Sequence, residues 1–209
     1  DNPDLVKIGK KESVNEKDIV LITYADMVKD DNEMPLRTLG RLLNEYLVYL
    51  ISTVHILPFY PYSSDDGFAV IDYRQVNPEF GTWRDISEIN QNFKLMFDAV
   101  INHCSTKNAM FQGFLRGDSD KLDFFTTVEA NTDLSKVFRP RATPVVTPFR
   151  TKDGEKLVWT TFSADQVDLN FRNPDVLLEM IDIILFYVLH GAEFIRFDAV
   201  TYVWKELGT

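Results

Sequence analysis

The chain has 209 residues, 45% of them hydrophobic and 26% charged, which is the composition of a globular protein with a sizeable core. Its formal net charge of -10 argues against nucleic acid or an anionic membrane as the main partner, because both attract positive charge. No apolar run is long enough for a transmembrane helix. The single cysteine, Cys104, excludes an internal disulfide and favours a reducing compartment, so we expect a cytoplasmic protein.

Short apolar runs alternate with helical patterns along most of the chain. Residues 1–17 are charged and have no period, so we expect an irregular lead-in. Leucines at helical spacing follow Pro35, a residue suited to a first helical turn. The patterns predict helices over 36–47, weakly over 82–92, and over 174–189 with Gly191 as a C-terminal cap. Runs rich in branched and aromatic side chains predict buried strands over 18–24, 51–57, 93–102 and 192–198.

Strands that alternate with helices predict a parallel sheet, either doubly wound or closed as a barrel. The first strand is not followed by a Gly-x-Gly-x-x-Gly sequence, which weakens the dinucleotide-binding alternative. Residues 103 to about 164 lose regular period, and we interpret them as an irregular insertion with a short hairpin near 157–161. A full (β/α)8 barrel takes about 250 residues, so these four strands indicate a fragment of a longer protein.

Polar clusters follow three of the four predicted strands. Asp65 and Asp66 lie beyond the second strand, Asn102 and His103 end the third, and the fourth carries Arg196 and Asp198. In a (β/α)8 barrel, the carboxyl ends of the strands are where chemistry takes place. We therefore expect these side chains to contribute to one site.

Arg196 and Asp198 are two residues apart, a spacing that places both on the same face of a strand. An adjacent guanidinium group would keep the Asp198 carboxylate ionised, as a nucleophile requires. A structural ion pair at the end of a strand explains the spacing as well, so both interpretations stay open.

Other polar residues have two interpretations each. His103 can donate a hydrogen bond to a sugar hydroxyl or serve as a core histidine, whereas Asp98 is expected to be buried and structural, with an arginine as its partner. His55 lies inside an apolar strand and is expected to be structural. Arg139 and Arg141 form either a phosphate- or carboxylate-binding pair or a solvated surface pair. The histidines and the cysteine lack zinc-ligand spacing.

Taken together, the motifs resemble glycoside hydrolase family 13, the α-amylase family. The matching segments occur in that family's order: Ser64-Asp-Asp-Gly-Phe68 with Ile71-Asp-Tyr73, Asp98-Ala-Val-Ile-Asn-His103, Gln166-Val-Asp-Leu-Asn170 and Phe194-Ile-Arg-Phe-Asp-Ala199. Further segments look most like the sucrose phosphorylase subgroup: His55-Ile-Leu-Pro-Phe59, Phe138-Arg-Pro-Arg141, Phe162-Ser-Ala-Asp-Gln166 and Trp204-Lys-Glu-Leu-Gly-Thr209. Met34-Pro-Leu-Arg37 and Thr160-Thr-Phe-Ser163 look closer to its glucosylglycerate- and glucosylglycerol-phosphorylase-like members.

The resemblance implies the N-terminal half of a (β/α)8 TIM barrel, with an inserted domain B after the third strand. The corresponding boundaries are 1–102 for the first part of the barrel, 103–164 for the inserted domain, and 165–209 for the barrel continued through strand four. The general acid and a third carboxylate would come from strands beyond this chain. The chain alone is therefore expected to be inactive, and exposed sheet edges would weaken it further.

The resemblance also implies a role for each matching residue. Asp198 matches the nucleophile, and Arg196 matches the arginine beside it; these two form the catalytic prediction. Arg141 matches an arginine that contacts phosphate. The predicted sugar-binding residues are Asp65 and His103 for the glucosyl hydroxyls, Phe68 as an aromatic platform, and Phe162 and Gln166 at the edge of the acceptor site.

The implied reaction is retaining transfer of an α-glucosyl group by double displacement, with phosphorolysis of sucrose or glucosylglycerate to glucose 1-phosphate as the first expectation. Hydrolysis or transglycosylation, and an inactive binding homologue, are the alternatives. We expect a small carbohydrate and inorganic phosphate as substrates, no cofactor, no metal ion, and neither nucleic acid nor membrane as a partner. A homo-oligomer is compatible with the sequence.

Overall fold

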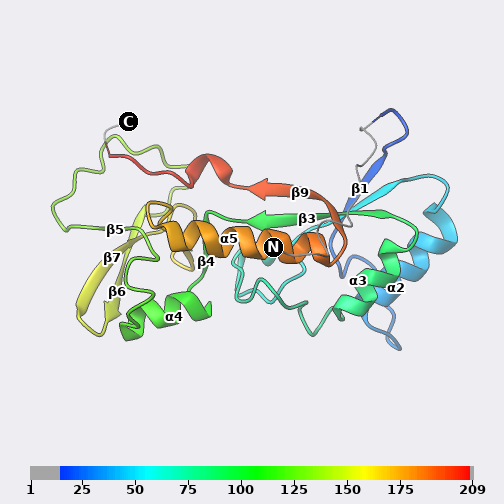
Figure 1. Cartoon of the computed structure of the whole chain (residues 1–209), viewed down its shortest axis with the longest axis horizontal. Coiled ribbons are helices and arrows are strands. Elements are labelled where there is room, and N and C mark those ends of the chain that lie inside the picture. The colour runs from blue at the N-terminus through cyan, green and yellow to red at the C-terminus, as the bar shows by residue number, and fades with distance from the viewer. Residues whose placement is uncertain (1–14, 208–209) are drawn as a thin grey trace. The chain divides into compact units, whose positions relative to one another are not determined.

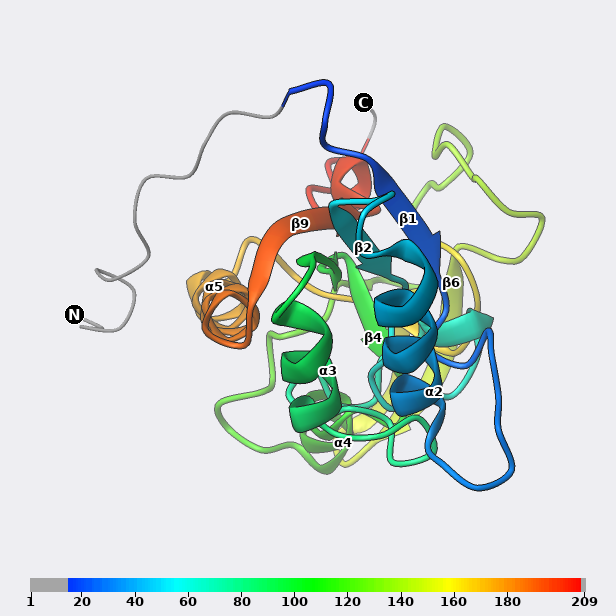
Figure 2. The ribbon, with the colours of Figure 1, turned by 90° about the vertical axis from the view of Figure 1, so that its right-hand side faces the viewer.

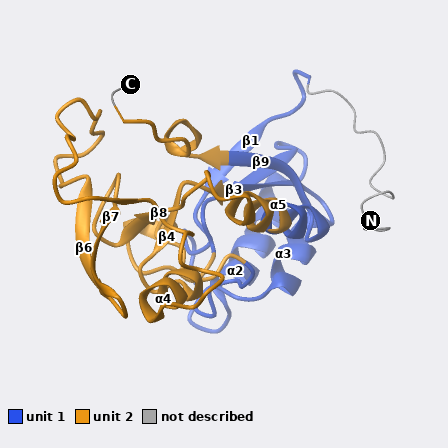
Figure 3. Ribbon diagram, turned by 60° about the vertical axis from the view of Figure 1, so that its left-hand side comes forward, with its two compact units in different colours: residues 1–59, 74–98, 183–196 blue, residues 60–73, 99–182, 197–209 orange. Residues whose placement is uncertain are grey.

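The computed structural model describes residues 15–207 (Figure 1). The lead-in predicted over 1–17 therefore lies almost entirely outside the described residues. The chain divides into two compact units, coloured separately in Figure 3. Unit 1 consists of Asp1–Phe59, Arg74–Asp98 and Ile183–Arg196, and unit 2 consists of Tyr60–Tyr73, Ala99–Asp182 and Phe197–Thr209. The segment predicted as an insertion, 103–164, belongs to unit 2.

A four-stranded sheet forms the centre of unit 1. Its strands lie in the order β1 (Val20–Thr23), β2 (Thr53–Ile56), β3 (Lys94–Val100) and β9 (Ala192–Asp198). The pairs β1–β2 and β2–β3 are parallel, and Figure 1 shows β9 beside β3 and pointing the same way. All four residues of β2 are buried, the apolar Val54 and Ile56 as well as the polar Thr53 and His55. The four predicted strands are confirmed.

Helices α2 (Pro35–Leu42) and α3 (Trp83–Asn90) lie side by side in Figure 2, and both predicted helices are confirmed. Pro35 occupies the first turn of α2, where its missing N–H costs nothing. The helix continues into a π-helical turn, η1 (Leu43–Leu47), which the leucine spacing did not reveal. Helix α3 begins with a capping box in which Thr82 and Asp85 satisfy each other's backbone N–H groups.

Aromatic side chains fill the core of unit 1. The ring of Phe97, on β3, packs edge-on against Phe59 and Tyr187, with ring centroids 5.0 and 6.1 Å away. Trp83, at the start of α3, packs against Phe186 at 5.3 Å. Both Phe186 and Tyr187 come from helix α5 (Pro174–Leu189), whose bounds match the prediction, as do those of β9. These contacts hold the sheet to the helices that follow its strands.

Unit 2 contains more regular structure than the sequence indicated. It has an antiparallel pair, β4 (His103–Ser105) with β8 (Gln166–Asp168), and a three-stranded sheet in the order β5 (Thr127–Val128), β7 (Gly154–Trp159) and β6 (Val146–Thr151). A hairpin is present, formed by β6 and β7, but it is longer than expected and lies earlier in the chain: the predicted range 157–161 overlaps only the end of β7. The prediction that residues 103–164 are irregular is wrong for β4, β5, β6 and β7 and for helix α4 (Ala109–Arg116); β8 lies just beyond that range.

Short helical turns complete the described structure: η2 (Asp65–Gly67) and η3 (Val200–Tyr202), both in unit 2. Within residues 15–207, no helix has the length and apolar character needed to cross a membrane.

Candidate active site

The pairing of β4 with β8 places the first predicted site residues. In this antiparallel register His103 lies opposite Asp168, and Ser105 lies opposite Gln166. His103 and Gln166 therefore occupy diagonal positions on neighbouring strands, and Gln166 Nε2 lies 3.2 Å from His103 Nε2. Residues more than sixty positions apart in the sequence meet because two three-residue strands pair.

The loop after β2 brings Asp65 to the same place. The backbone of Asp65, Asp66 and Gly67 has φ values of 56°, 49° and 105°, three successive residues in the left-handed region. Non-glycine residues adopt this conformation at a cost, and such strain is concentrated at functional sites. The strained turn presents the Asp65 carboxylate to Gln166, whose Nε2 donates to Asp65 Oδ2 over 2.9 Å.

Two aromatic residues complete the cluster. The carbonyl oxygen of Phe68 lies 3.1 Å from His103 Nε2. The ring of Phe162 packs on the imidazole with centroids 5.1 Å apart, and on Tyr202 at 5.3 Å. The structure thus brings together all five residues predicted to bind sugar, Asp65, Phe68, His103, Phe162 and Gln166, and all five belong to unit 2.

His103 is buried, with 1% of its surface exposed, and this burial decides its charge. Removal from water lowers the pKa of the imidazole, because the charged form loses its hydration. The carboxylates of Asp168, Asp198 and Asp65 act in the opposite direction without reversing the effect. A neutral imidazole at pH 7 is suited to hydrogen bonding with a hydroxyl group.

Asp198 ends β9 and is partly exposed. The next residue, Ala199, has a φ of 55°, so the chain turns sharply in a left-handed conformation immediately after the predicted nucleophile. Turn η3 follows and carries Tyr202, the residue that contacts Phe162. The negative charge of Asp198 acts to raise the pKa of His103, against the larger effect of burial, and both residues belong to unit 2.

Arg196 forms an ion pair with Asp98, through Nη1 and Oδ1. The Asp98 carboxylate is completely buried, and His55 Nε2 approaches its other oxygen at 2.7 Å. The sequence-based expectations that Asp98 is buried with an arginine partner and that His55 is structural are confirmed. A buried carboxylate needs such partners, because an unpaired charge inside a protein is very costly.

Arg139 and Arg141 lie apart from these contacts, on an exposed stretch of unit 2. Within the described part of the chain, Arg141 has no hydrogen-bond or ion-pair partner, and its predicted contact with phosphate stays a prediction.

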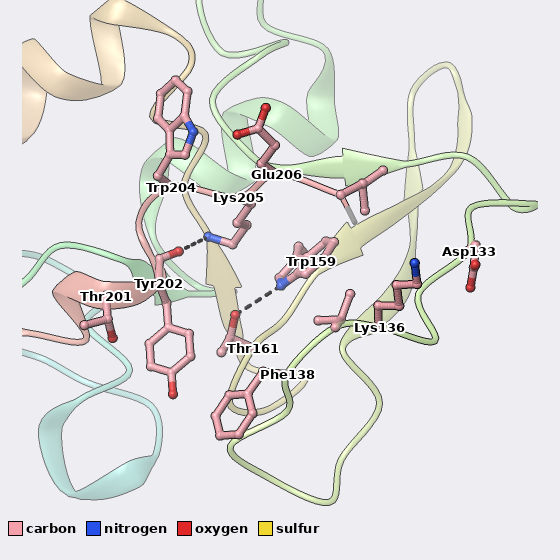
Figure 4. Close-up of a pocket in the computed structure, with 12 residues that line it drawn as sticks. Asp133, Lys136, Phe138, Trp159, Thr161, Thr201, Tyr202, Trp204, Lys205 and Glu206 are labelled. Atoms are coloured by element: carbon pink, nitrogen blue, oxygen red, sulfur yellow. Dashed lines mark hydrogen bonds between the residues drawn. The ribbon is translucent and has the colours of Figure 1, made fainter. Parts of the chain in front are cut away.

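A cavity of about 610 Å³ opens in unit 2 (Figure 4). Its volume falls in the range of small-molecule sites. Four aromatic residues line it, together with two lysines and two carboxylates: Phe138, Trp159, Tyr202, Trp204, Lys136, Lys205, Asp133 and Glu206. Figure 4 shows the Trp159 indole N–H directed to Thr161 Oγ1, 3.1 Å away. Tyr202 links this cavity to Phe162 of the sugar-binding cluster. Aromatic surfaces of this kind suit the apolar faces of sugar rings.

The sequence analysis missed one organising residue, Asp165. Its carboxylate accepts hydrogen bonds from the hydroxyls of Ser63 (2.5 Å), Ser64 (2.6 Å) and Thr106 (2.5 Å). Burial alone raises the pKa of Asp165, but these hydrogen bonds outweigh it and lower the pKa below its ordinary value. Asp165 is followed by Gln166, and Ser64 is followed by Asp65. The hydrogen bond between Ser64 and Asp165 therefore connects the two segments that carry these sugar-binding residues. Hydroxyl pairs at 63–64 and 105–106 were the available sequence signal.

A model of the alpha-amylase catalytic domain matches residues 44–208. The chain belongs to the alpha-amylase family. Its described fold is accordingly the N-terminal part of the family's (β/α)8 barrel. The family match includes every predicted site residue, from Asp65 to Asp198.

Two curated relatives of this alpha-amylase family chain are glucosylglycerate phosphorylases. It is 58% identical over 208 residues to the glucosylglycerate phosphorylase of Spirochaeta thermophila, covering 100% of this chain and 35% of the relative. It is 57% identical over 195 residues to the glucosylglycerate phosphorylase of Allomeiothermus silvanus, covering 93% of this chain and 35% of the relative. The chain thus spans about a third of the length of these relatives.

A solved structure of another phosphorylase is also similar to this chain. Sucrose 6F-phosphate phosphorylase from Thermoanaerobacter thermosaccharolyticum superposes with a TM-score of 0.85 at 32% identity, covering 94% of this chain and 42% of that one.

Proposed function

We propose that the full-length protein is a retaining phosphorylase that transfers the glucosyl group of an α-glucoside, glucosylglycerate in the first instance, to inorganic phosphate. The observation that carries the proposal is the contact of Gln166 Nε2 with both Asp65 and His103, which assembles the cluster predicted to hold the glucosyl unit. Identities of 57% and 58% to glucosylglycerate phosphorylases support the choice of substrate.

In the proposed reaction, the Asp198 carboxylate attacks the anomeric carbon as the glycosidic C–O bond breaks. A general acid protonates the departing glycerate oxygen. A phosphate oxygen then attacks the same carbon and displaces Asp198, which yields glucose 1-phosphate with retained configuration. Retaining enzymes place their two carboxyl groups about 5–5.5 Å apart. We propose that the acid belongs to a strand beyond this chain, so that the chain alone is inactive.

The charged partners of β9 support this role for Asp198. Arg196, two residues earlier, is anchored by its ion pair with the buried Asp98. We propose that its guanidinium group keeps Asp198 ionised, since a positive charge nearby favours the carboxylate over the acid. His103, neutral because it is buried, would hold a glucosyl hydroxyl.

Phosphate is the proposed co-substrate, with Arg141 as its contact, because an exposed guanidinium group offers two parallel donors to phosphate oxygens. The proposal includes no cofactor and no metal ion. It also places the protein in the cytoplasm. The one cysteine, Cys104, is a buried free thiol, and its burial raises the pKa of the thiol well above its ordinary value.

The test uses the full-length protein with glucosylglycerate, sucrose and glucosylglycerol, each with and without phosphate. We expect phosphate-dependent glucose 1-phosphate, fastest from glucosylglycerate, and its loss by at least a thousandfold in Asp198→Asn. Asp153→Asn, a change on an exposed turn of unit 2, is the matched control and should retain activity. Glucose release at the same rate without phosphate would favour the hydrolase alternative. No turnover of any donor would count against the proposal.

A further inference from the structure

A part-buried lysine, Lys205, contacts Asn102, the residue before His103, and neither the family motifs nor the proposed mechanism gives it a task. The Lys205 side chain is 12% exposed. Its ammonium group contacts Asp168 Oδ2 at 2.9 Å, Asn102 Oδ1 at 3.1 Å and the carbonyl oxygen of Tyr202 at 2.7 Å. An ammonium group has three N–H donors and no acceptor, so these three oxygens satisfy it completely.

The ammonium group determines how the Asn102 amide is oriented. Because Lys205 is a pure donor, the amide oxygen must face it, and the amide nitrogen must point the other way. That nitrogen lies 3.0 Å from Asp168 Oδ2, a carboxylate oxygen that can only accept. The carboxylate of Asp168 is fully buried and also accepts from Thr161 N at 3.0 Å. Lys205 thus fixes the position of the Asn102 amide oxygen, and Asp168 fixes the position of its amide nitrogen.

The orientation of the Asn102 amide in turn determines which ring nitrogen of His103 carries the proton. Asn102 Nδ2 lies 3.2 Å from His103 Nδ1, and since the amide nitrogen donates, Nδ1 must accept. In a neutral imidazole the proton then resides on Nε2. This N–H faces the carbonyl oxygen of Phe68, 3.1 Å away. The opposite tautomer would bring two N–H groups together at Nδ1 and two acceptors together at Nε2.

Gln166 opposes this assignment at Nε2. Its Oε1 accepts from Ser163 Oγ at 2.9 Å, which directs its amide nitrogen toward Asp65 and His103. An amide N–H 3.2 Å from His103 Nε2 favours an accepting Nε2, so this contact favours the opposite tautomer. The Asn102 amide at Nδ1 and the Phe68 carbonyl oxygen at Nε2 both favour the Nε2–H tautomer, two contacts against one.

We propose that Lys205 is a positioning residue: through Asn102 it holds His103 as the Nε2–H tautomer, so that His103 offers an N–H donor to a hydroxyl of the bound glucoside. The last step rests on the proposed function, whereas the tautomer does not. Lys205 lies seven residues after Asp198, so the segment that follows the nucleophile also prepares the sugar-binding histidine.

The test measures the tautomer of His103 directly in the full-length protein, by long-range nitrogen–proton correlation spectra of isotope-labelled histidine. His103→Gln assigns the signal. We expect pure Nε2–H in the unmodified protein, an Nδ1–H population in Lys205→Met, and predominantly Nδ1–H in Asn102→Asp, whose carboxylate demands a donor. In Lys205→Met, kcat/KM for the glucoside should fall about tenfold, the loss of one aligned hydrogen bond to substrate.

Lys156→Met, an exposed lysine on β7, is the control and should change neither the spectrum nor kcat/KM. If Lys205→Met lowers thermal stability but leaves His103 purely Nε2–H, the lysine is merely structural and the inference is overturned. A shift in Asn102→Asp alone would also overturn it, because Asp168 would then suffice to orient Asn102. The spectra remain decisive even if the protein fails to use phosphate, so failure of the proposed function is distinguishable.

Discussion

Several side chains in unit 2 hold neighbouring segments in place through hydrogen bonds. Asp165 is the clearest case, because its two carboxylate oxygens accept hydrogen bonds from the hydroxyl groups of Ser63, Ser64 and Thr106. This arrangement works only while the carboxylate is ionised, since a protonated or amidated group accepts fewer hydrogen bonds and adds donors of its own.

We therefore expect Asp165→Asn to destabilise the full-length protein by about 2 kcal/mol at pH 7, the range for hydrogen bonds to a charged group. The folded-state pKa of Asp165 is lowered, so its stabilisation is present above its ordinary value of 3.8 and is lost as pH falls through the folded value. Thermal unfolding of both proteins over a pH series should show their difference shrinking below pH 3.8.

The control for this comparison is Asp153→Asn, on the exposed turn between β6 and β7, which should change stability little at any pH. A difference for Asp165→Asn that grows as the solution becomes more acidic would contradict the assigned hydrogen bonds.

Secondary-structure elements show where sequence reasoning succeeds and where it fails. Helix α5 and strand β9 were predicted with correct bounds, because a sixteen-residue helix and a seven-residue strand display their periods clearly. Helix α4 was missed, although its ends carry recognisable signals. The Asn108 side chain accepts from Met110 N at the first turn, and Gly117, with a φ of 77°, ends the helix.

Helix α3 was predicted only weakly, because its apolar period is short. Its beginning is nonetheless well defined: Asp85 Oδ2 accepts from both Thr82 N and Thr82 Oγ1 at 2.7 Å. Arg37 of α2 donates to the other oxygen of Asp85 at 2.8 Å, so one carboxylate caps α3 and joins two helices. The capping residues were visible in the sequence; the long-range partner was not.

We expect Thr82→Ala to destabilise the protein by about 1 kcal/mol, the usual cost of removing an N-terminal cap. Urea unfolding of the full-length protein, followed by circular dichroism, measures this change. Thr82→Ser keeps the hydroxyl and is the matched control, expected within a few tenths of a kcal/mol of the unmodified protein. Equal losses in both variants would show that the methyl group rather than the cap matters.

For the molecule as a whole, the sequence predicted the (β/α)8 class and the identity of the residues that gather around His103. It did not predict the two compact units, because each is assembled from three separate chain segments and no local pattern reports which segments meet. For the same reason the sequence did not predict a role for Lys205. This residue lies in a family-like motif, but its role depends on its contacts with Asn102 and Asp168, which are distant in the sequence. Long-range polar contacts are properties of the fold, not of any window of sequence.

The sheet of unit 1 has open edges. Within residues 15–207, strands β1 and β9 of the order β1-β2-β3-β9 are each hydrogen-bonded to one neighbouring strand, whereas every strand of a closed barrel has two. Large apolar side chains are exposed on both edge strands and on α5: Val20, Ile22, Phe197, Leu178 and Leu185. The chain spans 35% of the length of each of two longer relatives.

We therefore predict that the 209-residue chain, expressed alone, binds an apolar fluorescent dye more strongly per molecule than the full-length protein and self-associates during gel filtration, because unpaired strand edges and exposed apolar surface promote both. It should also produce no glucose 1-phosphate. Replacing Ile22 with lysine places a charge on the edge strand β1, where Ile22 is 61% exposed, and should reduce self-association. A monomeric chain with no excess dye binding would show that these surfaces need no covering.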